Sequence, residues 1–194
     1  MNLISHRAIK LFTVGLFCFS LGLIFCLILK PRGLSINDGI SYYGNYRQTI
    51  LPYTVAIIGY GFFTLVVARS ITNKELSPLK YGLYLFAFLC LIITITPDNA
   101  NSFLDITHTT VGSVLFILQL TLSGWLIVKL RFKAWAVVFA VAEFLSGVAC
   151  AFYIPGHNGF LIQAQIIFQM FFAALMYLAL NGLRINSSVG KLGS

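Results

Sequence analysis

Hydrophobic residues occur in six long, nearly uninterrupted runs, and short segments rich in charged residues, proline and asparagine separate them. A helix that spans the hydrocarbon core of a bilayer needs about 20 mostly apolar residues. Six segments meet or approach that length, at about 11–29, 51–68, 79–96, 107–128, 134–153 and 160–183. Each run is apolar on all sides, unlike the alternating strands of an outer-membrane barrel. The pattern therefore predicts an all-α integral membrane protein, a six-transmembrane-helix bundle forming one domain over residues 1–194.

The composition agrees with a membrane protein and excludes several other classes. Hydrophobic residues make up 59% of the chain and charged residues only 9%, whereas soluble domains average about 25% charged residues. This balance excludes a soluble globular enzyme, a disordered chain and a disulfide scaffold. The four cysteines lie within apolar runs, where cysteine behaves as a small hydrophobe. The net charge of +8 is scattered between the runs, without the basic patch of a nucleic-acid binder, so no nucleic-acid partner is expected.

The positions of the basic residues predict the orientation of the bundle. Six spans place both termini on one side, together with ten of the 13 Lys and Arg residues. The other three, Lys30, Arg32 and Arg47, lie in the first loop on the opposite side. Because positively charged loops are retained in the cytoplasm, we expect a multi-pass protein of the cell (inner or plasma) membrane with both termini cytoplasmic.

The longest connection between predicted spans is the outer loop at residues 30–50. It contains three glycines, which permit turns, and three tyrosines, which suit the headgroup level of a membrane. We expect this loop to lie over the outer mouth of the bundle.

Short motifs after the first and third spans resemble a known family. They are Leu34-Ser35-Ile36, then Ile40-Ser41-Tyr42-Tyr43-Gly44, then Pro52 at the start of a span, and later Pro97-Asp98 followed by His108. The chain resembles the bacterial and archaeal six-span family catalogued as domain of unknown function 998, and it is distantly similar to the Frag/DRAM/Sfk membrane family. The resemblance implies a six-helix membrane fold. Since the family has no established reaction, it implies no catalytic residues.

Several ionisable residues map to the outer face of the predicted bundle, and they are Asp38, Asp98, Asp105, His108 and His157. Histidines and carboxylates together bind divalent metals or act as general acid and base, so His108 and His157 are candidate metal ligands. Histidine also senses pH near neutrality. The structural alternative is that Asp105 caps the fourth helix, as Asp commonly does, while Asp98 and His157 belong to polar turns.

The interior of the bundle holds a second set of candidates. Glu143 lies ten residues from Lys133, about 15 Å into the membrane at 1.5 Å per residue. A carboxyl group at this depth usually faces the bundle interior and is a functional hypothesis by default. Gln119 and Gln169 lie at similar depth on the fourth and sixth spans, and Gln165 shares a helix face with Gln169.

Two interpretations of these interior residues stay open. Polar side chains hydrogen-bond across membrane helices and hold them together, or they form a site for a ligand, a proton or an ion. Because no Lys or Arg lies at that depth, Glu143 has no counter-ion. Burial disfavours the charged form, so we expect a neutral acid hydrogen-bonded to a glutamine.

Missing motifs narrow the choice of function. The sequence contains no Walker loop, dinucleotide fingerprint, nucleophile elbow or haem-attachment motif, and no cofactor is expected. Our leading hypothesis is a protein that binds or moves a small amphipathic or lipid-like molecule from the outer leaflet. The alternatives are a structural or assembly subunit, as a homo-oligomer or with a membrane partner, and a membrane-embedded hydrolase with a His/Asp site at the outer face.

Overall fold

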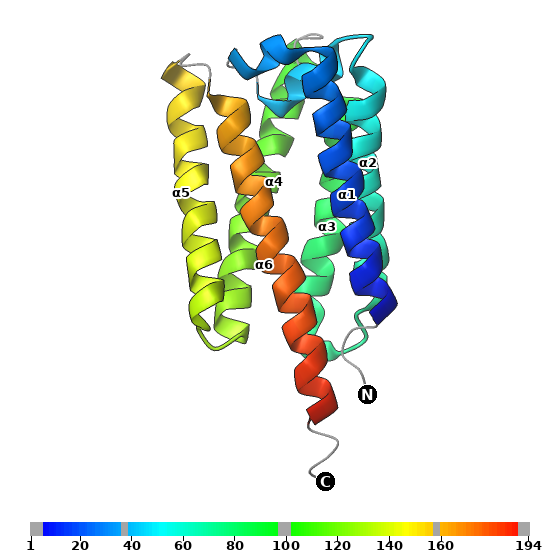
Figure 1. Ribbon diagram of the computed structural model, residues 1–194, viewed down its shortest axis with the longest axis vertical. Coiled ribbons are helices and arrows are strands. Elements are labelled where there is room, and N and C mark those ends of the chain that lie inside the picture. Colours follow the sequence, from blue (N-terminus) through cyan, green and yellow to red (C-terminus); the bar gives the residue numbers. More distant parts are fainter. Residues whose placement is uncertain (1–5, 36–38, 97–101, 157–159, 190–194) are drawn as a thin grey trace.

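The computed structural model describes residues 6–35, 39–96, 102–156 and 160–189, which form six long helices with short 3₁₀ turns between some of them (Figure 1). The long helices are α1 (His6–Leu29), α2 (Ile50–Ser70), α3 (Ser77–Ile95), α4 (Ser102–Lys129), α5 (Ala134–Gly156) and α6 (Leu161–Val189). The 3₁₀ turns are η1 (Pro31–Ser35), η2 (Ile40–Asn45) and η3 (Lys74–Leu76). All six long helices are long and apolar enough to cross a membrane, which confirms the predicted six-helix membrane fold.

Each helix runs antiparallel to its neighbour in the sequence and packs against it (Figure 1). The sixth helix contacts α5, α1 and α4, so it closes the bundle and lies next to helices from both ends of the chain. The first and last helices begin and end at the same end of the bundle, where α6 extends beyond the others (Figure 1).

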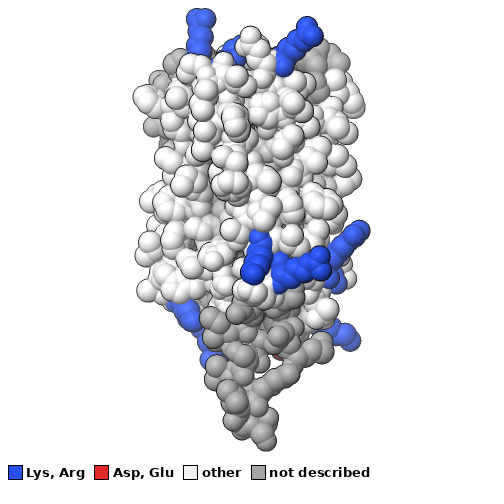
Figure 2. Space-filling view, turned by 45° about the vertical axis from the view of Figure 1, so that its right-hand side comes forward, with Lys and Arg blue, Asp and Glu red and all other residues white. Residues whose placement is uncertain are grey.

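The outer surface of the bundle is apolar, as a lipid-facing surface must be. Only 22–39% of the most apolar stretch of each helix is buried inside the protein. Large hydrophobic side chains such as Phe17 and Leu51 are exposed. Figure 2 shows Lys and Arg side chains toward the two ends of the bundle, with a broad uncharged band between them. Since charged side chains are expensive in hydrocarbon, this band is where the bilayer fits.

Three helices extend five or more residues beyond their hydrophobic runs. The first begins at His6 and the fourth at Ser102, where we expected starts at 11 and 107, and the sixth continues to Val189, beyond the expected end at 183. These extensions are helical but include polar residues. A hydropathy pattern detects long apolar runs and therefore misses them. The fifth helix runs to Gly156, where we expected Pro155 and Gly156 to stop it. Pro155 lacks a backbone N–H and so removes one helix hydrogen bond, and the helix ends one residue later at Gly156.

Small residues allow the first two helices to approach closely. A Cβ atom placed on Gly22 of α1 would lie 2.6 Å from the Ala56 side chain and 2.7 Å from the Pro52 carbonyl oxygen of α2. Any larger residue at Gly22 would therefore push the helices apart. The close approach agrees with the expectation that small residues serve packing.

The outer loop lies over one end of the bundle (Figure 1), as its composition predicts. The Gln165 side-chain oxygen of α6 accepts a hydrogen bond from the Ile40 backbone N–H at 2.7 Å, and the Gln163 amide donates to the Leu34 carbonyl at 2.8 Å. Gly39 adopts a φ of 71°, a conformation that disfavours side chains. Two side chains of one helix therefore hold the backbone of a loop more than a hundred residues earlier in the sequence.

Candidate functional site

Glu143 lies fully buried in the interior of the bundle, at 0% exposure. Its Oε2 atom accepts a hydrogen bond of 2.5 Å from the Ser123 hydroxyl of α4. Its Oε1 atom is also buried but has no hydrogen-bond partner in the part of the chain that the structure describes. The expected inward orientation is therefore confirmed, but the expected partner is wrong, because a serine rather than a glutamine bonds the carboxyl group.

Gln119 and Gln169 bond each other instead. The Gln119 amide donates to the Gln169 oxygen at 2.8 Å, and the Gln169 amide donates back to the Gln119 oxygen at 3.0 Å. Gln119 is fully buried and Gln169 is partly buried. This reciprocal pair joins α4 to α6 across the interior. Each amide offers its donor and its acceptor to the other, so the pair is a structural contact between two helices.

Gln165 is the third predicted glutamine, and it lies one turn closer to the N-terminal end of α6. Its side-chain oxygen holds the backbone of the outer loop, as described above. The four interior candidates therefore do not converge on one point. Glu143 keeps an unused polar atom, while the glutamines are engaged in packing contacts.

Two hydroxyl groups that the sequence analysis did not single out also lie unbonded in the interior. Tyr60 and Thr64 of α2 are 3% and 1% exposed, and neither hydroxyl has a hydrogen-bond partner among the described residues. They are four residues apart and so share one face of the helix.

Aromatic rings surround Tyr60. Its ring centroid lies 5.2 Å from those of Phe19 of α1 and Phe86 of α3, and 6.2 Å from that of Phe12. Aromatic pairs favour such separations. The phenol oxygen is therefore the polar end of an otherwise apolar cluster. A four-residue spacing in the sequence could have identified these groups. Tyr60 and Thr64 share one face of their helix, and Gln119 and Ser123 share one face of theirs.

The candidates of the outer face are placed differently from the expectation. His108 is buried, and its Nδ1 atom donates to the Thr96 carbonyl at 2.5 Å, so it links α4 to the end of α3 and is not part of an open rim. Asp105 lies in the first turn of α4, three residues after the helix begins. It is therefore not the cap, although a negative charge in the first turn is favourable.

The other outer-face candidates, Asp38, Asp98 and His157, lie outside the described residues. Within the described ranges, no group of three His, Cys, Asp or Glu side chains is arranged to hold a metal ion. The residues that we expected to join His108 and Asp105 in a metal or acid–base site therefore lie outside the described part of the chain. The hydrolase hypothesis stays a prediction.

A groove on the lipid-facing surface separates α4 from α5 near the buried carboxyl group. It has a volume of about 250 Å³ and is lined by Leu120, Ser123, Gly124, Ile127, Ala140, Val141 and Phe144. A Cβ atom on Gly124 would meet no atom within 4 Å. Three of the seven lining residues, Ser123, Gly124 and Ala140, are small, which leaves space between the larger ones. Its lining includes Ser123, the hydrogen-bond donor to Glu143.

Comparisons of the chain with models of protein families, with curated proteins and with solved structures find no match. The resemblance to domain of unknown function 998 therefore stays a prediction.

Proposed function

We propose that the protein binds a small amphipathic, lipid-like molecule within the bilayer and holds its polar group at Glu143. The observation that carries this proposal is the free Oε1 atom of a fully buried carboxyl group. Leaving a buried polar atom without a partner costs about 1–3 kcal/mol, and more for a charged group. A bound molecule that offers a hydrogen-bond donor would remove this cost.

Other buried groups support a ligand rather than a purely structural role. The hydroxyls of Tyr60 and Thr64 are also buried without partners among the described residues. Polar side chains that only hold helices together bond each other, as Gln119 and Gln169 do. Several unused polar atoms in one apolar interior are what a binding site requires, because a ligand completes their bonding.

The ligand in this proposal comes from the surrounding lipid. The sequence led us to expect that the molecule comes from the outer leaflet, on the side of the loop at residues 30–50. That loop is held to α6 by Gln163 and Gln165, and His108 is buried. These contacts favour a route through the side of the bundle instead.

We further propose that the protein resides in the cell membrane with both termini in the cytoplasm. Ten of the 13 basic residues belong to the side of the termini. This asymmetry follows the positive-inside rule, by which short loops rich in Lys and Arg stay in the cytoplasm.

Native mass spectrometry of the protein extracted in mild detergent tests the proposed binding. We expect the wild-type protein to retain a small molecule, and Glu143→Leu to lose it. Val138→Leu is the matched control, since Val138 is an exposed residue of the same helix and should retain the molecule. Circular dichroism must show that the variants are folded. The same bound mass in folded Glu143→Leu and in the wild-type protein would contradict the proposal.

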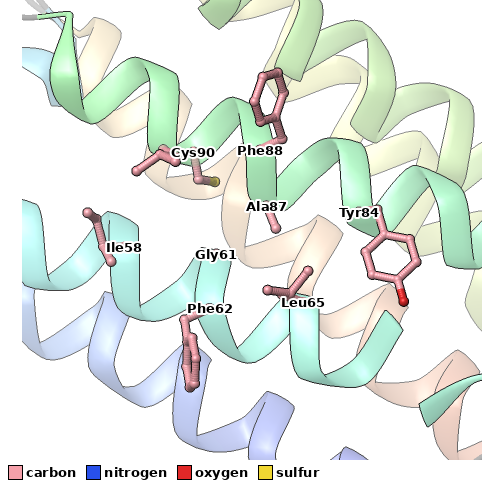
Figure 3. Close-up of a pocket in the computed structure, with 9 residues that line it drawn as sticks. Ile58, Gly61, Phe62, Leu65, Tyr84, Ala87, Phe88 and Cys90 are labelled. Carbon is pink, nitrogen blue, oxygen red and sulfur yellow. The ribbon is translucent and has the colours of Figure 1, made fainter. Parts of the chain in front are cut away.

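A second candidate function is that of an assembly subunit, because a surface groove fits a partner helix. Figure 3 shows this groove between α2 and α3, with Gly61 and Ala87 facing each other across it. Its volume is about 330 Å³, and it includes the exposed rings of Phe62 and Phe88. Membrane helices associate through van der Waals packing, and the exposed rings beside this groove offer an apolar surface for it. Cross-linking from a cysteine placed at Phe62 would test it, with capture of a second copy or of a membrane partner as the expected result.

A further inference from the structure

One polar side chain, Ser123, connects the groove between α4 and α5 to the buried acid. Leu120, Ser123, Gly124 and Ile127 line it from α4, and these positions lie on one face of that helix. Ser123 is 2% exposed and donates its hydroxyl hydrogen to Glu143. The same side chain therefore contacts the groove on one side and the carboxyl group on the other.

The charges near the groove select the class of ligand. Among the three acidic residues that the structure describes, Glu143 is the one that lies far from the helix ends. None of the seven described residues that line the groove is Lys or Arg. A carboxylate or phosphate headgroup would meet Glu143 without a compensating cation, which is unfavourable in an environment of low polarity. An amine is complementary, because a carboxylate pairs with its ammonium form.

The remaining walls of the groove suit a hydrocarbon chain and a cation. Leu120, Ile127 and Val141 offer apolar contact, and Phe144 offers an aromatic ring, which attracts cations through its face. Pockets for drug-sized ligands measure about 300–1,000 Å³. A groove of about 250 Å³ lies below that range, so a single alkyl chain fits it better than a two-chain lipid.

We infer that the α4–α5 groove is the entrance and binding site for a single-chain lipophilic amine, with its nitrogen at Ser123 and Glu143 and its chain along the groove. This inference rests on the proposed function and names its ligand and route. The amine enters from hydrocarbon in its neutral form, and the proton of the Glu143 carboxyl group moves to the amine nitrogen. The products are an ammonium and a carboxylate, so no net charge crosses the lipid.

The position of the groove also predicts the leaflet from which the amine enters. Ser123 lies six residues before the end of α4 at Lys129, or about 9 Å at 1.5 Å per residue. The groove therefore opens into the half of the bilayer on the side of the termini. With the proposed orientation, this is the cytoplasmic leaflet.

Photo-cross-linking in phosphatidylcholine nanodiscs tests the inference. The probes are a 12-carbon primary amine, its alcohol and its carboxylic acid, each carrying a diazirine on the chain. We expect the amine to label residues of α4 and α5 along the groove roughly tenfold more than the alcohol, and the acid to label only at background. Glu143→Gln should lower amine labelling about tenfold, to the level of the alcohol, because a charge-assisted bond is lost.

Filling the groove tests the entrance separately. Gly124→Leu should lower labelling by the amine, and it should fold because the added side chain enters open space. Val141→Trp fills the same groove from α5 and should act alike. Val128→Leu is the matched control, since Val128 is exposed on α4 and does not line the groove.

The outcomes separate this inference from the proposed function. Equal labelling of the groove by amine and alcohol would overturn the amine assignment and leave the binding of an amphipathic molecule standing. Labelling that depends on Glu143 but not on Gly124 or Val141 would overturn the entrance. Uniform labelling of the lipid-facing surface by all three probes, together with no bound mass in native mass spectrometry, would overturn both proposals.

Discussion

The reciprocal bond between Gln119 and Gln169 predicts a measurable coupling between α4 and α6. We consider Gln119→Leu, Gln169→Leu and the double variant. Each single change leaves the other amide unpartnered in the interior, which costs about 1–3 kcal/mol of unfolding free energy. Replacing both partners by apolar side chains of similar size removes the unsatisfied groups. The double variant should therefore be more stable than the sum of the single effects predicts.

The size of the coupling follows from the two hydrogen bonds of 2.8 and 3.0 Å. Hydrogen bonds between membrane helices contribute about 0.6 kcal/mol on average and at most about 1.7 kcal/mol. Two bonds give a coupling of roughly 1 kcal/mol, with an upper limit near 3 kcal/mol. Unfolding in mixed micelles, driven by sodium dodecyl sulfate and followed by circular dichroism, measures these differences.

A control cycle pairs Gln119→Leu with Gln165→Leu. Gln165 bonds the outer loop instead of Gln119, and sites without shared partners add within about 0.5 kcal/mol. A coupling of zero between Gln119 and Gln169, or an equal coupling in the control pair, would refute the interpretation of the glutamine pair as a helix contact. In that case both amides would again be candidates for ligand binding.

Three further predictions concern the site, the loop and the topology. Ser123→Ala removes the hydrogen bond to the buried carboxyl group and should lower the unfolding free energy by about 1–3 kcal/mol, whereas Ser123→Thr should not, as micelle unfolding would show. Gly39→Ala should loosen the outer loop and speed its proteolysis, because the positive φ and the nearby α6 amide leave no room for a Cβ atom; unchanged proteolysis would contradict this. A cysteine at Arg47 should react with an impermeant reagent on intact cells and a cysteine at Asn73 should not, and the reverse result would overturn the orientation.

The sequence predicted the depth of the polar residues in the bundle better than it predicted their partners. Depth follows from counting residues along a helix, because each adds 1.5 Å. Glu143 was correctly expected to face the interior, since a lipid-facing carboxyl group is expensive. Its partner depends on the rotation of α4 about its own axis. Gln119 and Ser123 share one face of α4, but the apolar spans around them do not indicate which helix that face meets.

A similar limit explains why His108 was placed incorrectly on the outer face. His108 was assigned to the outer face because it lies at the start of the fourth run. In the structure, α4 begins five residues earlier than expected, and the histidine turns inward to the Thr96 carbonyl. The first turn of α4 contains the polar residues Ser102 and Asp105. A hydropathy pattern therefore does not include this turn in the apolar run. The placement of a residue near a helix end is correspondingly less predictable than that of one in the middle.

The chemical identity of residue 143 is the strongest argument for a role beyond packing. Gln119 and Gln169 show that this interior uses neutral amides where it joins helices. A glutamine at 143 would accept the same bond from Ser123, and it would avoid the cost of an ionisable group near the middle of a membrane. What glutamate adds is a proton that can leave. Glu143→Gln therefore preserves the Ser123 contact and removes only the exchange of that proton. If the folded variant bound the amine probe as well as the wild-type protein does, the ionisable group would have no part in binding.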